Sequence, residues 1–222
     1  MSTKLPKGRP SPSTTPEARE AKRRRILEAA AAEFAQFGFD SASIESIAVR
    51  AGIGKGTIYG YTHSKDQLYS ACLQLIADEM HQFLEETVSS IVEEAMRASD
   101  EPTSFHRFAP ISEQLAHLAH RRQDFLAMYF DSIFGVNPRG RDLVVPSARE
   151  FIAGLEQLFM AAQSHGFVRT DAPAGMIASL VFMNRLAFPR MVDGLGLGTY
   201  SPTERTEFLF EMHWHGIAKP AP

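Results

Sequence analysis

The fold of this 222-residue chain is decided by residues 43–65, SIESIAVRAGIGKGTIYGYTHSK. This stretch predicts two short helices joined by a tight turn at Gly52, and the second helix carries a Lys-Gly-Thr-x-Tyr-x-Tyr face. Two helices joined by a short turn that contains glycine are typical of a helix-turn-helix DNA reader, whose second helix enters the major groove. We therefore expect residues 55–61 to form the helix that reads DNA.

The residues on either side predict the neighbouring helices. Thr15, followed by proline and glutamate, is a helix start that leads into an apolar repeat ending near Phe37, where Gly38 stops the helix. Ser43 is the expected N-cap of the second helix. Residues 64–67, Ser-Lys-Asp-Gln, form a capping box that opens a fourth helix, whose apolar stripe runs for about 30 residues.

The rest of the chain predicts further helices and no convincing strand pair. Pro110 either starts or kinks the first of these helices. The expected helices cover residues 103–120, 122–134, 147–165, 171–192 and 203–217. The fold class is therefore all-α, with about nine helices. We expect a flexible basic arm at 1–16, a three-helix DNA-binding domain at 17–66, and a helical domain at 67–222 that is joined to it by the long fourth helix.

Charge is distributed unevenly along the chain. Residues 1–65 carry eleven Lys and Arg against six Asp and Glu, a net of +5, whereas the remainder carries twelve against twenty, a net of −8. A basic end on an acidic body is expected when only one end of a protein meets DNA phosphates. The single cysteine, Cys72, favours a reducing compartment. No apolar run is long enough for a membrane span, and the N-terminus has no apolar stretch after its lysines, which argues against a secretory signal. We therefore expect a cytoplasmic protein with no membrane partner.

An ordered set of residues spans the N-terminal third of the chain. Its members are Ile26, Leu27, Ala29, Ala30, Phe34, Gly38, Phe39, Ser43, Ile44, Ile47, Ala48, Ala51, Gly52, Ile53, Lys55, Gly56, Thr57, Ile58, Tyr59, Tyr61 and Lys65. Through this set, the first part of the chain resembles the TetR family of transcriptional regulators. The resemblance implies that the remainder is a ligand-binding and dimerisation domain, although the later residues are similar to the family only in length and helical class.

The chemistry of residues 55–61 suits a DNA-reading face. Lysine offers an ammonium to phosphate or to the acceptor edge of guanine, and threonine can meet a thymine methyl group or a phosphate. The resemblance implies phosphate contacts from Ser43, Tyr59, Tyr61 and Lys65, and base or mixed contacts from Lys55, Gly56 and Thr57. The alternative is that both tyrosines are core aromatics and that the lysines belong to a solvated face.

Three positions depart from the family pattern. Thr62 stands where the family usually has an aromatic side chain that anchors the reading helix, and Gly54 replaces the usual serine cap. Gly60 weakens the helix by about 1 kcal/mol relative to alanine. We therefore expect the reading helix to be loose in the free protein and to become ordered on DNA.

Two basic segments precede the reading helices. Residues 22–25, which include Arg24, either contact phosphate beside the reader or form a solvated basic face. Residues 7–10, Lys-Gly-Arg-Pro, resemble the core of an AT-hook, an arm whose arginine lies in the narrow A·T minor groove. Arg9 is therefore a candidate minor-groove residue, and four residues alone leave open whether the arm enters the groove.

The later helices carry the candidates for dimerisation and ligand binding. One short helix reads only a few base pairs, so a twofold symmetric homodimer on an inverted repeat is the simplest reader of double-stranded DNA. The candidate interface residues are Met176, Leu180, Phe208 and Met212. The candidate pocket residues for a small apolar or aromatic effector are Phe105, Phe108, Met128, Phe130, Phe134, Phe151, Phe159, Phe182 and Met183, and for each the alternative is a plain core position.

We expect no cofactor, no metal and no catalysis. The pairs His117 with His120 and His213 with His215 lack a further ligand at metal-binding spacing. The pattern as a whole favours a ligand-responsive dimeric repressor, in which a ligand shifts the fourth helix so that the two readers no longer match the operator. A constitutive or architectural DNA-binding protein with no effector is the alternative.

Overall fold

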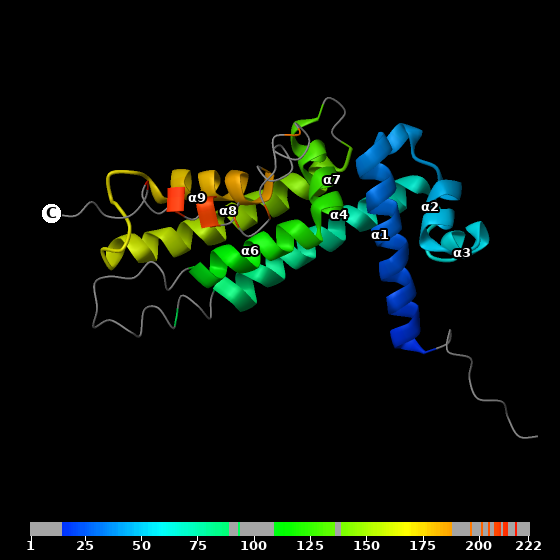
Figure 1. Ribbon diagram of the computed structural model, residues 1–222, viewed down its shortest axis with the longest axis horizontal. Helices are drawn as coiled ribbons and strands as arrows, with labels where there is room; N and C mark the ends of the chain where they lie inside the picture. The colour runs from blue at the N-terminus through cyan, green and yellow to red at the C-terminus, as the bar shows by residue number, and fades with distance from the viewer. Residues whose placement is uncertain are drawn as a thin grey trace, which may run out of the picture. The chain divides into compact units, whose positions relative to one another are not determined.

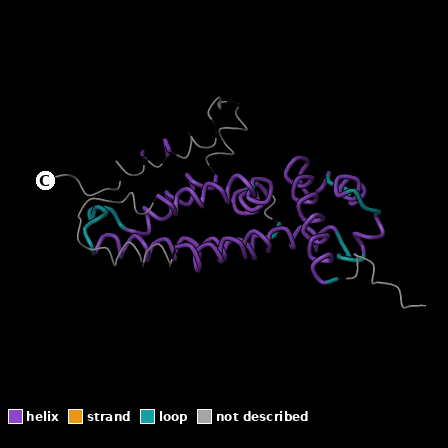
Figure 2. Tube along the Cα trace, turned by 60° about the horizontal axis from the view of Figure 1, so that its bottom comes forward, coloured by secondary structure: helices purple, strands orange, loops and turns teal. Residues whose placement is uncertain are grey.

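The computed structural model describes residues 15–88, 109–135 and 139–187, together with the separate positions 93, 196, 201, 204, 207–209, 211–212 and 216. Figure 1 shows the order of its helices, and Figure 2 shows helix and loop along the described trace. Every element in this part of the chain is a helix, which confirms the predicted all-α class. The chain divides into two compact units, Met1–Cys72 and Leu73–Pro222, and the division falls inside helix α4 (Lys65–Gln82).

The N-terminal unit contains the predicted helix-turn-helix. Its helices are α1 (Pro16–Ser41), α2 (Ile44–Ala51), α3 (Lys55–Tyr59) and the beginning of α4. The reading helix α3 ends two residues earlier than the expected range of 55–61.

Polar caps and two glycines set the ends of these helices. Thr15 and Ser43 each accept a hydrogen bond on the side-chain oxygen from the backbone N–H three residues along, at 3.2 and 3.0 Å. Both predicted N-caps are thereby confirmed. Gly38 has a φ of 74° and interrupts α1 at the predicted stop, and Gly52 has a φ of 63° in the turn between α2 and α3. Side chains rarely tolerate a positive φ, so glycine is needed at both turns.

Apolar side chains fill the centre of the N-terminal unit. The buried set includes Ile26, Leu27, Ala30, Phe34, Ile47, Ile58, Leu68 and Cys72. Each fully buried leucine or isoleucine contributes about 1.5–3 kcal/mol to stability. The rings of Phe34, Phe39 and Tyr69 lie with centroids 5.1 to 5.8 Å apart, so they pack the end of α1 against the beginning of α4.

The predicted capping box at the start of α4 is present. The Ser64 hydroxyl accepts a hydrogen bond from the Gln67 backbone N–H at 3.1 Å, and the Gln67 side chain accepts one from the His63 backbone N–H at 3.0 Å. Beyond Gln82 the chain continues as a π-helical segment, η2 (Phe83–Val88). Most of the remaining apolar stripe predicted for this helix lies outside the described residues.

The C-terminal unit is built from the end of α4 and the later helices. These are η2, α6 (Ala109–Arg121), α7 (Gln123–Phe134), α8 (Arg141–Ser164), α9 (Ala174–Phe182) and the π-helical segment η4 (Met183–Ala187). Pro110 is the second residue of α6, so it lies in the first turn, where its missing N–H costs nothing.

Helix α8 begins at Arg141, and the predicted start at Ser147 was therefore wrong. Gly140, with a φ of 79°, turns the chain into the helix. Val144 is fully buried, and its carbonyl accepts a hydrogen bond from the buried Tyr129 hydroxyl at 3.1 Å. This anchoring holds the first turns helical although Pro146 lies within them.

A run of aromatic rings forms part of the core of the C-terminal unit. Phe83 stacks on Phe151 with centroids 6.2 Å apart. Phe182 lies 5.8 Å from Phe151 and 5.6 Å from Phe130, which in turn stacks on Phe134 at 6.3 Å. The run therefore joins η2, α8, α9 and α7 in one core. No helix in the described part of the chain combines the length and apolarity that crossing a membrane requires.

Candidate nucleic-acid interface

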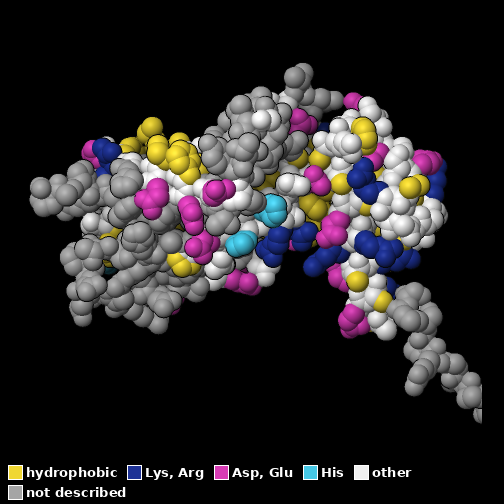
Figure 3. All heavy atoms as spheres, in the orientation of Figure 1, with side chains coloured by type: hydrophobic (Ala, Val, Ile, Leu, Met, Phe, Trp, Pro, Cys, Tyr) yellow, Lys and Arg dark blue, Asp and Glu magenta, His cyan; other side chains and the backbone are white. Residues whose placement is uncertain are grey.

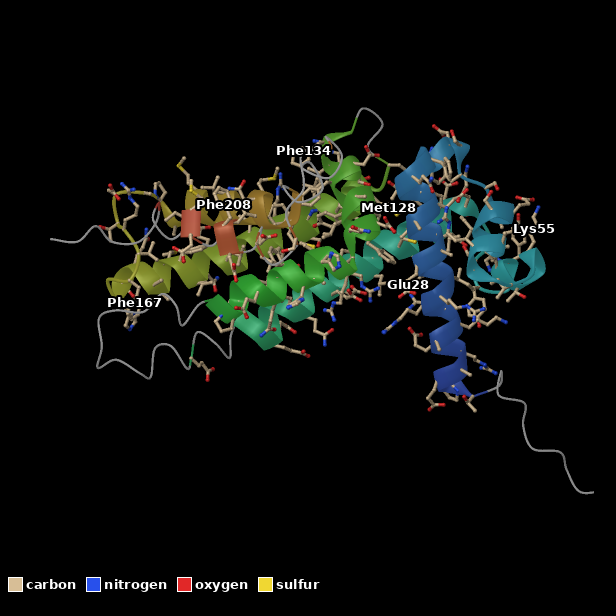
Figure 4. The ribbon with its side chains drawn as sticks, viewed as in Figure 1. Glu28, Lys55, Met128, Phe134, Phe167 and Phe208 are labelled. Atoms are coloured by element: carbon tan, nitrogen blue, oxygen red, sulfur yellow. The ribbon has the colours of Figure 1, made fainter. Side chains whose placement is uncertain are left out.

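Helix α3 presents the side chains predicted to read DNA. Ile58 is completely buried and anchors the helix to α2 and the core. Tyr59 and Tyr61 remain 44% and 40% exposed, so the alternative that they are core aromatics is wrong. Lys55 lies on the outer side of the α2–α3 pair (Figure 4), and Gly56 is exposed while Thr57 is half-buried. The predicted face of α3 is thus open to a ligand as large as DNA.

The short α3 is held by its backbone. The carbonyl of Ile58 accepts hydrogen bonds from the N–H groups of Tyr61 and Thr62, at 2.8 and 2.9 Å. Thr62 is buried, and its hydroxyl donates to the Ser64 carbonyl at 3.0 Å. Where the family usually has an aromatic anchor, this chain therefore has a hydrogen-bonded threonine that leads into the cap of α4.

A contact between α2 and α3 was not foreseen from the sequence. The Lys55 ammonium donates a hydrogen bond to Glu45, in the first turn of α2, and its Nζ lies 5.9 Å from the centroid of the Tyr59 ring. The hydrogen bond from Lys55 lowers the pKa of the Glu45 carboxyl, and Glu45 raises the pKa of Lys55. The sequence does contain an indication of this contact. Glu45 is the second residue of α2, and the apolar residues Ile44 and Ile47 are buried on another face of that helix, so Glu45 is left exposed and free to meet a cation.

Two of the predicted phosphate-binding residues have structural partners in the free protein. The Ser43 hydroxyl caps α2 and also shares a hydrogen bond with the Ser46 hydroxyl at 2.8 Å. Lys65 Nζ donates to the carbonyls of Asp40 and Ala42, at 3.2 and 3.0 Å, and lies 4.6 Å from the centroid of the Phe39 ring. Lys65 thereby closes the end of α1, whose last turn holds no basic residue of its own.

A second ion pair fixes α2 against α1. Arg50 Nη2 lies 3.3 Å from Glu33 Oε2 and donates to Gln36 Oε1 at 3.0 Å. The Glu33 side chain is only 5% exposed, so its charge needs this partner. The pair holds the helix-turn-helix in register on α1.

Basic side chains lie on the N-terminal unit, as the charge distribution predicted. Figure 3 shows Lys and Arg side chains over this unit with some Asp and Glu among them, and several Asp and Glu side chains over the C-terminal unit. Arg24 is exposed on α1, and its neighbour Arg23 forms an exposed ion pair with Glu20 at 3.5 Å. Arg9 and residues 1–14 of the predicted arm lie outside the described residues, and α1 already begins at Pro16, inside the range predicted for the arm.

The candidate pocket residues divide into buried and exposed groups. Met128, Phe130, Phe151, Phe159 and Phe182 are buried in the C-terminal unit. Phe134 and Met183 are exposed. Phe134 stacks on Phe130 and is the last ring of the aromatic run. Figure 4 labels its position on α7. Phe105 and Phe108 lie outside the described residues.

The candidate interface residues are all exposed apolar side chains. Met176 and Leu180 lie four residues apart on α9 and remain 69% and 50% exposed. Phe208 and Met212 repeat the same spacing and are also exposed. Figure 3 shows yellow side chains gathered at the surface of the C-terminal unit. An apolar stripe of this kind on one helix face is typical of a protein interface.

The histidines give no indication of a metal site in the described residues. No group of three or more His, Cys, Asp and Glu side chains in this part of the chain is arranged to hold a metal ion. His117 and His120 are exposed on α6, whereas His213 and His215 lie outside the described residues.

The N-terminal unit is similar to known DNA-binding regulators. Residues 26–72 match the family model of bacterial regulatory proteins of the tetR family. Over 58 residues the chain is 45% identical to the HTH-type transcriptional regulator RutR of Escherichia coli strain K12. The aligned segment covers 26% of this chain and 27% of RutR. The chain matches about a third or less of the length of the first curated relatives.

Solved structures share the fold over most of the chain. The ketosteroid transcriptional regulator KstR2 of Mycobacterium tuberculosis superposes with a TM-score of 0.67 at 18% identity, over 90% of this chain and 96% of KstR2. The fatty acid degradation regulator FadR of Bacillus halodurans gives a TM-score of 0.66 at 16% identity, over 88% of this chain and 95% of FadR. Identities this low show a common fold over most of the chain and no more.

Proposed function

We propose that this chain is a homodimeric transcriptional repressor of the TetR family of bacterial regulatory proteins, and that it binds an inverted-repeat operator through α3. A small apolar or aromatic ligand in the C-terminal unit releases the operator. The repressor works in the cytoplasm, where its DNA target lies. It uses no cofactor.

The observation that carries this proposal is the exposed face of α3. Lys55 and Tyr59 project from α3, which the buried Ile58 fixes to the core, and Tyr61 is exposed in the turn that follows the helix. Phenol hydroxyls and an ammonium on one exposed surface can bind phosphate oxygens and base edges together, which is what an operator reader needs. Ser43, Gly56, Thr57 and Lys65 complete the surface that meets DNA, with Arg24 beside it.

Dimerisation is supported by the exposed stripe on α9. Met176, Leu180 and Met183 repeat at spacings of four and three, which places them on one face of the helix and its continuation. Burying this face against a second copy removes apolar surface from water and sets two α3 helices at a fixed separation. Phe208 and Met212, which are also exposed apolar side chains, are further candidates for this interface.

Ligand control is supported by the aromatic core of the C-terminal unit. Phe130, Phe151 and Phe182 can line a site for a bulky apolar compound, and Met128 can adapt its shape to such a ligand. The names of KstR2 and FadR refer to ketosteroids and to fatty acid degradation, and both kinds of compound are apolar.

Helix α4 is the proposed connection between ligand and DNA. It begins in the N-terminal unit and ends in the C-terminal unit, so a tilt at one end is carried to the other. A ligand can favour the tilted state only by the difference between its affinities for the two states. In the tilted state, the two α3 helices no longer match the spacing of the half-sites.

Selection of DNA from a random pool by the full-length protein tests the proposal. We expect an inverted repeat to be enriched, and fluorescence anisotropy at fixed salt to show weaker binding for Lys55→Ala and Tyr59→Phe. Arg149→Ala, which removes an exposed arginine of α8, is the control and should bind as the wild type does. Wild-type affinity in both α3 variants would overturn the assignment.

Thermal shift with a panel of apolar compounds tests ligand control. A ligand at 100 times its dissociation constant adds about 2.7 kcal/mol to the stability of the protein. A compound that both raises the melting temperature and releases the selected operator supports the repressor mechanism. If no compound does either, a constitutive DNA-binding regulator without an effector becomes the better description.

A further inference from the structure

The ion pair between Glu45 and Lys55 joins the two helices of the helix-turn-helix. Glu45 lies in the first turn of α2, and Lys55 is the first residue of α3. Their side chains are 61% and 49% exposed, although they contact each other. The Tyr59 ring flanks the ammonium at 5.9 Å. The carboxylate and the aromatic ring therefore hold the lysine at a defined position. The lysine and the carboxylate both remain open to solvent.

This position is the one from which base edges are read. In a helix-turn-helix, the N-terminal residues of the second helix contact the edges of bases in the major groove. Lys55 is the most N-terminal residue of α3, and Glu45 is one hydrogen bond away from it. Ile44 and Ile47 are buried on the opposite face of α2, so Glu45 points away from the core.

The charge of Glu45 needs an explanation at a surface that meets DNA. An isolated carboxylate facing the duplex is repelled by the phosphates, but a carboxylate paired with lysine is close to neutral. The pair also offers a donor beside an acceptor. Guanine presents the acceptors N7 and O6 in the major groove, and its partner cytosine presents the N4 amino donor. Donor and acceptor therefore match the two halves of a G·C pair.

We propose that Glu45 and Lys55 together read one G·C pair in each half-site, with Glu45 accepting from cytosine N4 and Lys55 donating to guanine. This assignment rests on the proposed operator-binding function. Thymine places the acceptor O4 where cytosine has its amino group, so the carboxylate rejects an A·T pair at this position. Glu45 is thereby a specificity-determining residue, in addition to those on α3.

Selection from a random duplex pool is carried out with the full-length wild type, Glu45→Ala and Glu45→Gln. The wild type should enrich an operator with a strongly preferred cytosine in each half-site. Competition binding with single-base variants then measures discrimination at that position. In Glu45→Ala we expect this discrimination to fall by roughly 5- to 150-fold, the range for one good base contact. Because glutamine pairs with adenine N6 and N7, Glu45→Gln should shift the preferred base from cytosine towards adenine.

Glu20→Gln is the matched control. Glu20 forms an exposed ion pair with Arg23 on α1. Glu20→Gln therefore removes one exposed carboxylate and one exposed ion pair, as Glu45→Gln does, but at a site outside α2 and α3. A general rise in DNA affinity is expected in this control, with the preferred bases unchanged. Circular dichroism verifies that each variant keeps its helices. We expect α2 to remain intact in the Glu45 variants, because its N-cap, Ser43, is unchanged.

The outcomes separate this inference from the proposed function. If the wild type enriches an operator and both Glu45 variants keep its base preferences, Glu45 does not read a base and the inference is overturned. The same holds if both variants only gain affinity for every duplex, because Glu45 then acts only by repelling phosphate. If the wild type enriches no sequence at all, operator binding itself is wrong and the inference fails with it.

Discussion

The guanidinium of Arg122 donates two hydrogen bonds to the carboxylate of Glu79, each 2.7 Å long. Glu79 lies near the end of α4, and Arg122 lies between α6 and α7, so the pair ties α4 to the α6–α7 junction within the C-terminal unit. The two side chains are only 15% and 22% exposed, and the guanidinium also lies 5.5 Å from the centroid of the Phe125 ring. A two-pronged pair of this kind is among the stronger polar contacts in proteins.

Arg122→Ala should lower the free energy of unfolding by about 2 kcal/mol, because it leaves the Glu79 carboxylate partly buried without its cation. Urea denaturation followed by circular dichroism measures the change. Arg121→Ala is the control, since Arg121 is the exposed neighbour in the chain, and it should change stability by no more than about 0.5 kcal/mol.

A double-mutant cycle with Glu79→Ala checks that the effect comes from the pair. Removing Glu79 in the Arg122→Ala background should cost much less than removing it from the wild type. If the two single changes simply add, the stabilisation comes from packing of the arginine stem and the ion pair contributes nothing.

Lys65→Met should weaken the N-terminal unit by about 1–2 kcal/mol, since it removes two hydrogen bonds to the end of α1 and the contact with the Phe39 ring. Thermal melting of the free protein measures this loss. Lys65 is also a predicted phosphate contact, so anisotropy well below the melting temperature should show weaker operator binding. Unchanged operator affinity in a destabilised variant would mean that Lys65 serves only the fold.

Features that depend on neighbouring residues could be predicted from the sequence. The N-caps Thr15 and Ser43 and the stop at Gly38 depend on residues within a turn of one another, and all three are present. The sequence Ser-Pro-Thr-Glu at 201–204 also has the pattern of a capping box, and its hydrogen bonds are present. The Ser201 hydroxyl accepts from the Glu204 N–H at 3.2 Å, and the Glu204 carboxylate accepts from the Ser201 N–H at 2.7 Å. Local hydrogen bonding is readable because it needs no knowledge of the fold.

Contacts between distant residues could not be predicted in this way. Two adjacent arginines such as Arg121 and Arg122 are typical of a solvated surface, and this interpretation of the sequence is wrong for Arg122. Its partner Glu79 lies 43 positions away in the chain. The partners of Lys65 and the pairing of Glu45 with Lys55 likewise depend on how helices cross. The exposed face of α3 was predictable because Ile58 is the apolar residue that must turn inward.

Asp171→Asn should reduce stability at neutral pH and lose its effect in acid. Arg169 donates from Nε and Nη2 to the two carboxylate oxygens of Asp171, at 2.5 Å each, and so lowers the pKa of Asp171. The ionised carboxylate is therefore favoured in the folded protein. Its contribution is present above the unfolded pKa of about 4 and disappears as the pH falls through the lower folded value.

Melting temperatures of the wild type and Asp171→Asn at pH 7, 5 and 3 measure this dependence. The difference should be small, because both side chains are exposed, and it should shrink between pH 5 and 3. In an Arg169→Gln background the Asp171→Asn change should have no effect at any of these pH values. A difference that persists at pH 3 would assign the role of Asp171 to something other than its charge.

Leu180→Glu should convert the proposed dimer into a monomer. Leu180 and Met176 are exposed on the same face of α9, and a carboxylate buried at a symmetric apolar interface would meet its own copy or an apolar neighbour without a cation. Light scattering after size-exclusion chromatography should give the mass of two chains for the wild type and of one chain for the variant. Operator affinity should fall by about 10²- to 10⁴-fold, because linkage of the two half-sites is lost.

Gln123→Glu is the control for this prediction. It adds the same charge at the exposed first turn of α7, where the helix dipole favours it, and should leave mass and affinity unchanged. A Leu180→Glu protein that remains a dimer with wild-type operator affinity would place the interface on a different face of the C-terminal unit.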